Sequence, residues 1–173
     1  MTKNFDEKKV VYSGWMNLFK VSVNGKWYEY LENHDAVACI VQDMDNKILL
    51  VEQFRPALLS KTLEIPAGCI DKGNESKEQI MIEELKEEAD LDVDVQDIKE
   101  VITYKPIVGF SNSTMHIYEV KVNVKGEDKE ITGDDVSKIK WVTISEWKEL
   151  IESGYINDSK TMMAYYYFMS QKR

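Results

Sequence analysis

The chain contains little of what marks secreted and membrane proteins. Its 173 residues include only two cysteines, Cys39 and Cys69, too few for the disulfide framework of a small secreted domain. No apolar run approaches the roughly 20 residues that span a bilayer, and the first residues, MTKNFDEKK, contain no apolar signal-peptide core. We therefore expect a cytoplasmic protein with no membrane partner.

Positive charge is also scarce. Lysine and arginine number 22 against 31 aspartate and glutamate residues, which gives a formal net charge of -9. Nucleic acid binding normally needs a basic surface, so we expect no nucleic acid partner. The same charge repels a free phosphate compound, although bound cations would offset that repulsion locally.

What the chain does have is enough apolar sequence for one core and a separate β-rich start. Hydrophobic residues make up 43% of the chain, which is typical of a globular domain. Near the start, Asn24-Gly25 lies between two runs of strand-forming residues, the strongest short signal for a β-hairpin. We expect residues 1–33 to form a small antiparallel sheet and residues 34–173 to form the main domain.

The main domain shows an α+β pattern. The apolar run at 36–42 predicts a strand buried on both faces. Ser76 and Gln79 predict a capping box, and Asp90 stands where a helix-ending glycine is usual. Ser145 is the predicted N-cap of a later helix. We expect strands at 36–42, 47–54, 62–65, 101–107, 115–124 and 139–142, and helices at 76–90, 145–153 and 158–171.

The first of these helices carries three acidic residues, Glu84, Glu87 and Glu88, with the spacing i, i+3 and i+4. This spacing places the carboxylates on one helix face, where they repel one another. An acidic face is often only solvated, but a divalent cation would also explain it. Mg²⁺ takes few protein carboxylates and leaves room for water and phosphates. The helix therefore predicts a metal-dependent enzyme with a phosphorylated substrate.

The residues around this helix resemble the signature of the Nudix hydrolases. LEIPAG at 63–68 precedes EELKEEADL at 83–91. Gly68 matches the first glycine of the Nudix box, Glu75 matches its first glutamate after a one-residue insertion, and the three carboxylates follow in register. EQFRP at 52–56, GFSN at 109–112 and the run 153–168 are similar to the ADP-ribose pyrophosphatase branch. The resemblance implies an α/β/α sandwich.

The resemblance also implies an activity: hydrolysis of the pyrophosphate of a nucleoside diphosphate sugar, with ADP-ribose yielding AMP and ribose 5-phosphate. Glu84, Glu87, Glu88 and the backbone carbonyl of Ala67 would hold Mg²⁺ or Mn²⁺. Glu84 and Glu87 would be catalytic. A further acid from a late loop is expected, for which the candidates are Asp134, Asp135 and, next, Glu130.

The resemblance places substrate contacts elsewhere in the chain. Arg55 would contact phosphate or ribose, a role that suits its planar guanidinium. The other expected substrate-binding residues are Glu64, Trp27, Trp15, Tyr28, Phe110 and Ser111. Base stacking would come from aromatic residues of the N-terminal sheet, although tryptophans there are more often packing residues. In that branch this sheet crosses to a partner, which implies a homodimer.

Two residues depart from the family pattern and keep alternatives open. Glu83 replaces the box arginine and Asp90 replaces its last glycine. A glutamate beside the other carboxylates adds about 1 kcal/mol or more of unfavourable Coulomb energy per close pair. UDP-glucose or GDP-mannose is an alternative substrate, and a Nudix-fold ligand-binding protein with impaired catalysis is an alternative function.

Overall fold

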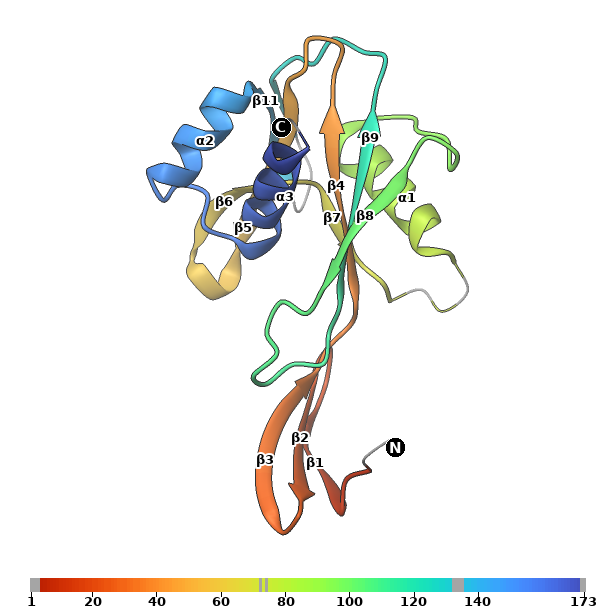
Figure 1. Cartoon of the computed structure of the whole chain (residues 1–173), viewed down its shortest axis with the longest axis vertical. Coiled ribbons are helices and arrows are strands. Elements are labelled where there is room, and N and C mark those ends of the chain that lie inside the picture. The colour runs from red at the N-terminus through yellow and green to blue at the C-terminus, as the bar shows by residue number, and fades with distance from the viewer. Residues whose placement is uncertain (1–3, 72, 74, 132–135, 172–173) are drawn as a thin grey trace.

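In the computed structural model, which describes residues 4–71, 73, 75–131 and 136–171, a mixed β-sheet lies between two layers of helices. Helix α1 (Lys77–Ala89) covers one face, and α2 (Ile144–Glu152) with α3 (Ser159–Ser170) lies on the other side of the sheet (Figure 1). A second, smaller sheet extends from the end of the main one. The predicted α+β fold, with its α/β/α sandwich and N-terminal sheet, is confirmed.

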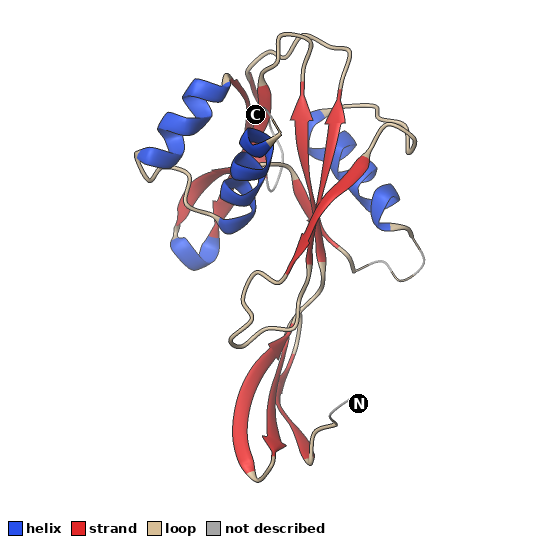
Figure 2. Cartoon of the chain, in the orientation of Figure 1, coloured by secondary structure: helices blue, strands red, loops and turns tan. Residues whose placement is uncertain are grey.

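The main sheet has eight strands in the order β10-β11-β5-β4-β9-β8, with β6 paired to β5 and β7 paired to β4. Figure 2 distinguishes the strands of the two sheets from the helices that flank the main one. A single 3-10 turn, Pro56–Leu58, follows β5. The strands are β4 (Ala36–Gln42), β5 (Ile48–Arg55), β6 (Ser60–Glu64), β7 (Ala67–Cys69), β8 (Lys99–Tyr104), β9 (Met115–Lys121), β10 (Lys129–Glu130) and β11 (Val136–Val142).

The sheet divides along one edge of β4. One edge of β4 pairs in parallel with β9 over its whole length. On the other edge, β5 pairs with β4 only where Gln42 meets Ile48, while β7 pairs with residues 36–38. Strand β5 therefore diverges from β4, and β7 takes its place beside the first half of the strand. The sequence did not predict β7, because Pro66 before it is typical of a strand end.

Side chains of β4 alternate between two hydrophobic clusters. Val37, Cys39 and Val41 pack in the cluster that contains the apolar face of α1. Ala38 and Ile40 pack in the cluster that contains residues of α2 and α3. All five are buried, or nearly so, and burying each large aliphatic side chain contributes about 1.5–3 kcal/mol. The predicted strand with two buried faces is confirmed.

The Ser76 half of the predicted capping box is present at the start of helix α1, and the helix ends at Asp90 as predicted. The Ser76 hydroxyl accepts a hydrogen bond from the Gln79 backbone N–H at 3.1 Å. Asp90 ends the helix in the left-handed conformation, with φ of 54°. Its backbone N–H bonds to the Lys86 carbonyl. These contacts fix the length of the helix, and hence where its carboxylates lie.

The N-terminal sheet consists of β1 (Glu7–Ser13), β2 (Asn17–Val23) and β3 (Lys26–Glu32), all antiparallel. Asn24 and Gly25 both have positive φ, 53° and 76°, as the predicted hairpin turn requires. Strand β1 is exposed along its whole length. In Figure 1 this sheet lies apart from the helices, joined to the main domain beside the loop between β8 and β9.

The helices are short relative to the thickness of a bilayer. Within the described ranges, none has the length and apolarity that a bilayer crossing needs. Both cysteines are free thiols, Cys39 buried and Cys69 exposed.

The predicted start of α2 at Ser145 was wrong. Thr143 is the N-cap: its hydroxyl accepts from the Glu146 backbone N–H at 3.2 Å, and the Glu146 carboxylate accepts from the Thr143 backbone N–H at 2.7 Å. This reciprocal pair outweighs the serine two residues later, which bonds only within the helix, to Glu149.

Thr143→Ala should therefore lower the free energy of unfolding by about 1 kcal/mol, because the helix loses its N-terminal acceptor. Urea denaturation followed by circular dichroism measures the change. Ser145→Ala is the matched control and should change stability by less than about 0.5 kcal/mol. Equal losses in both variants would contradict this assignment of the cap.

Candidate active site

The acidic face of α1 lies against β7. A Cβ atom at position 68 would lie 2.0 Å from Glu84 Oε1 and 2.1 Å from its carboxyl carbon, so a larger residue would force the Glu84 side chain to move. Glycine therefore lets the Glu84 carboxylate lie against the β7 backbone. The predicted match of Gly68 to the box glycine has this physical basis, and the approach brings Glu84 next to the Ala67–Cys69 strand.

Glu88 is the buried member of the acidic set, with 8% of its surface exposed. Its Oε1 accepts a hydrogen bond from Gln53 Nε2 on β5 at 2.6 Å. Its Oε2 accepts one from the Ala67 backbone N–H on β7 at 3.2 Å. One carboxylate therefore bridges the two strands that diverge along β4, and α1 is fastened to both.

Burial, and after it the neighbouring Glu84 carboxylate, raises the pKa of Glu88 to about 8. The Ala67 N–H, Lys160 and Arg55 act in the opposite direction without cancelling the effect. An added divalent cation would relieve this repulsion between two acids. The donor set of two inward carboxylates and a strand carbonyl suits a hard cation that keeps part of its water shell.

The third acid, Glu87, is exposed on the helix surface. Across the described residues, no three His, Cys, Asp or Glu side chains are grouped tightly enough to hold a metal ion by themselves. Asp134 and Asp135, the predicted late-loop acids, lie outside the described residues. Glu130 is exposed on β10 and forms an ion pair with Lys138 at 3.1 Å.

A second charged group lies between β5, β6 and α3. Arg55 donates to Glu64 with both ends of its guanidinium, Nε to Oε1 at 2.7 Å and Nη2 to Oε2 at 2.5 Å. Lys160 of α3 also contacts Glu64 Oε2, and pairs with Asp158 at 3.1 Å. Thr62 donates to the same carboxylate. Arg55 is therefore held in one orientation, with 42% of its side chain still exposed.

Burial would raise the pKa of Glu64, but Arg55, Lys160 and Thr62 together lower it to about 2. Although Glu64 is only 2% exposed, these partners keep its carboxylate ionised, and the carboxylate in turn orients Arg55. Helix α3 reinforces this segment, because the Ile65 backbone N–H donates to Thr161 Oγ1 at 3.0 Å.

Sequence reasoning missed Gln53, Lys160 and Thr161. Gln53 lies within EQFRP, a run that resembles the family. The first four residues of its strand are apolar and buried, so a polar residue shortly after them could have indicated a buried polar contact. Lys160 and Thr161 lie 96 residues after their respective partners, Glu64 and Ile65. No local pattern predicts such contacts.

The expected base-stacking residues gather at the other end of the molecule, around the N-terminal sheet. A cavity of about 610 Å³ between that sheet and the β8–β9 loop includes Tyr28, Phe110 and Ser111 in its lining. The Leu31 backbone N–H donates to the Phe110 carbonyl at 2.7 Å and holds the two together. Trp15 packs against His34 with ring centroids 4.6 Å apart, and Trp27 lies under the Lys9 ammonium.

The raised pKa of Glu88 predicts a pH dependence of stability. The folded protein binds a proton at Glu88 up to about pH 8, whereas the unfolded chain releases it near 4.5. Stability is therefore lost as pH rises through that window. In EDTA, Glu88→Gln should gain melting temperature relative to wild type between pH 5 and pH 8.

Differential scanning fluorimetry across that pH range tests this prediction. The exposed Glu152→Gln on α2 is the matched control and should run parallel to wild type. A Glu88→Gln curve that also stays parallel to wild type would contradict the assignment of a destabilising buried acid.

Most of the chain matches a known domain family. Residues 32–165 match the NUDIX domain. The chain is 30% identical to a methanol dehydrogenase activator of Bacillus methanolicus over 183 residues, which cover 99% of this chain and 97% of that protein. It is 29% identical to an ADP-ribose pyrophosphatase of Bacillus subtilis (strain 168) over 80% of this chain and 74% of the other.

A mouse ADP-sugar pyrophosphatase is 36% identical over 93 residues, 54% of this chain and 37% of that protein. The crystal structure of an ADP compounds hydrolase superposes with a TM-score of 0.75, covering 97% of this chain and 92% of the other, at 17% identity. That likeness supports the fold. The predicted resemblance is confirmed by the domain match and the full-length relative, and the chain belongs to the NUDIX family.

Proposed function

We propose that this protein hydrolyses the pyrophosphate bond of a nucleoside diphosphate sugar, with ADP-ribose favoured and AMP and ribose 5-phosphate as products. The relatives named for ADP-ribose and ADP-sugar pyrophosphatase activity support the proposal. The observation that carries it is the close set of Glu84, Glu88 and Arg55. Glu84 and Arg55 both act on the pKa of Glu88, Glu84 raising it and Arg55 lowering it, so carboxylates suited to a cation lie near a guanidinium suited to a phosphate.

Within this proposal Glu84, Glu87, Glu88 and the carbonyl of Ala67 would hold Mg²⁺ or Mn²⁺. When bound, the ions would neutralise phosphate charge and lower the pKa of a water. Arg55 would bind a phosphate through the exposed part of its guanidinium. Glu64, which is buried, would hold Arg55 in the required orientation, and Gln53 with the Ala67 N–H would do the same for Glu88.

We further propose that residues 1–33 form a dimerisation and substrate-contact segment, and residues 34–173 the hydrolase domain. Strand β1 exposes Val10, Val11 and Tyr12, an apolar edge that a second copy would cover. A partner sheet would bring Trp15 or Trp27 toward the base of the substrate, as would Tyr28, Phe110 and Ser111 from the cavity beside it. This proposal explains why the stacking candidates lie apart from α1 within one chain.

A second candidate function is activation of a dehydrogenase. The match to the methanol dehydrogenase activator includes the N-terminal sheet as well as the NUDIX domain. The exposed strand β1 of that sheet could contact a partner protein. Glu83 in place of the box arginine would suit a protein whose catalysis is impaired. If Glu83 limits the rate, Glu83→Arg should raise the turnover of ADP-ribose. If calorimetry shows that the wild-type protein binds ADP-ribose while a turnover assay shows no hydrolysis, the activator function is favoured.

Glu84→Gln or Glu87→Gln should reduce AMP release from ADP-ribose by at least about a hundredfold, because each removes a carboxylate that would hold the divalent cation. Nucleoside monophosphate release is measured in parallel with ADP-ribose, UDP-glucose and GDP-mannose, and ADP-ribose should show the highest kcat/KM. Glu152→Gln, an exposed acid on α2, is the control. Wild-type turnover in Glu84→Gln would refute the site.

Val10→Glu should convert the dimer into a monomer, because it places a charge in the middle of the exposed β1 strand. Sedimentation velocity measures the mass. Val95→Glu alters a similarly exposed valine on a different surface and should leave the dimer intact. A wild-type protein that sediments as a monomer at all concentrations would overturn the dimer proposal.

A further inference from the structure

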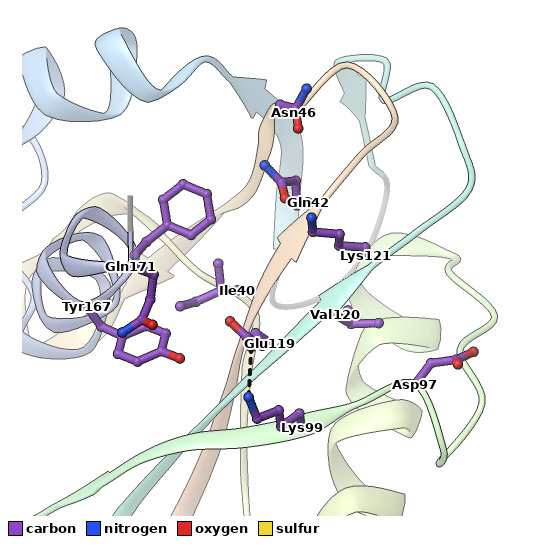
Figure 3. A pocket seen from close by; sticks show the side chains of 11 residues that line it. Ile40, Gln42, Asn46, Asp97, Lys99, Glu119, Val120, Lys121, Tyr167 and Gln171 are labelled. Atoms are coloured by element: carbon purple, nitrogen blue, oxygen red, sulfur yellow. Dashed lines mark ion pairs between the residues drawn. The ribbon is translucent and has the colours of Figure 1, made fainter. Parts of the chain in front are cut away.

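A second cavity lies on the face of the sheet opposite α1. It encloses about 720 Å³ between β4, β8, β9 and the end of α3 (Figure 3). Ile40 in its lining belongs to the hydrophobic cluster of α2 and α3, whereas α1 packs on the other face. This cavity is therefore separate from the Glu84–Glu88 site. Its lining residues are Ile40, Gln42, Asn46, Asp97, Lys99, Glu119, Val120, Lys121, Tyr167, Phe168 and Gln171.

Gln42 is the feature that points to a ligand. Its side chain is in the cavity lining and its residue is only 6% exposed. The Gln42 backbone carbonyl accepts a hydrogen bond from the Val122 N–H, but its side-chain amide has no hydrogen-bond partner among the described residues. Because Gln42 lies in the cavity wall, the hydrogen bonds of its amide have to come from water or from a ligand in the cavity. Since it offers both a donor and an acceptor, it suits a ligand whose edge carries both.

The wall of the cavity suits a planar ring. Tyr167 of α3 lies across the cavity from Ile40 and Gln42 in Figure 3. Its ring and the Ile40 side chain provide apolar surface, and Asn46 and Gln171 add two more amides to the lining. An aromatic heterocycle can stack on the ring while its edge bonds to the amides.

The lining carries two acids and two bases, of which Lys121 lies nearest to Gln42, whereas Asp97 lies apart from Lys121 in Figure 3. Gln42 and Lys121 are direct partners in the β4–β9 pair, and Glu119 lies opposite Lys99 in the β8–β9 pair. Glu119 is paired with Lys99 at 3.7 Å, which the dashed line in Figure 3 marks. Lys121 has no acidic partner among the residues that the structure describes. A lysine beside the unpaired amide favours an anionic group on the ligand.

We propose that this cavity is a second nucleotide-binding site, which takes a nucleoside monophosphate with its base toward Gln42 and Tyr167 and its phosphate toward Lys121. A volume of this size is in the usual range for a ligand of that size, about 300–1,000 Å³. The site lies beyond the proposed pyrophosphatase centre and needs neither its carboxylates nor a metal ion.

NMR titration with AMP in EDTA tests the proposal, read at the side-chain amides of Gln42, Asn46 and Gln171. These signals should shift and saturate, both in the wild-type protein and in Glu84→Gln. Adenosine should bind more weakly, and inorganic phosphate alone should leave the Gln42 amide unmoved. Shifts confined to β7, α1 and Arg55 would assign AMP to the pyrophosphatase centre alone and overturn the second site.

Two variants make the test specific. Gln42→Leu keeps the side-chain volume and should weaken AMP binding at the cavity by about tenfold, the effect of losing a hydrogen-bonding group. Lys121→Ala should weaken it several-fold while the fold is retained, since Lys121 is exposed. Lys148→Ala, an exposed lysine on α2, is the control. Unchanged affinity in both Gln42→Leu and Lys121→Ala would refute the proposal.

Discussion

The hydrogen bonds of Glu88 connect α1 to both strands that border the candidate active site. Because β5 leaves β4 after one pair, the sheet would be open between β5 and β7 without another connection. The Glu88 carboxylate provides it, with one oxygen on Gln53 and the other on the Ala67 N–H. Together with the core packing of Ile80, Met81 and Leu85, these hydrogen bonds set where the acidic face of α1 lies.

Two buried acids in this region are treated in opposite ways. Glu64 meets Arg55 and Lys160, and its pKa falls to about 2. Glu88 meets mainly low-dielectric surroundings and a second acid, and its pKa rises to about 8. Basic side chains thus neutralise the Glu64 carboxylate, whereas those near Glu88 do not offset its burial and the charge of Glu84. That imbalance is what a site needs if its positive charge is to come from a bound ion.

Local signals in the sequence predicted the parts that local physics determines. The Asn24-Gly25 turn, the doubly buried strand at 36–42 and the N-terminus of α1 at Ser76 are confirmed. The start of α2 was misplaced because Thr143 and Ser145 are both competent caps, and only the reciprocal bond with Glu146 distinguishes them. Lys160 and Gln53 escaped prediction because their partners are distant in the chain.

The alternation of β4 explains how one strand serves two separate regions. Odd-numbered residues from Val37 to Val41 face α1, so the strand supports the carboxylate helix on that side. Even-numbered residues face α3, where the apolar series ends at Gln42. A polar residue at the end of an apolar run usually signals the strand terminus and solvent. Here residues at the end of α3 line the same cavity as Gln42, so the end of the strand forms part of the cavity wall beside Lys121.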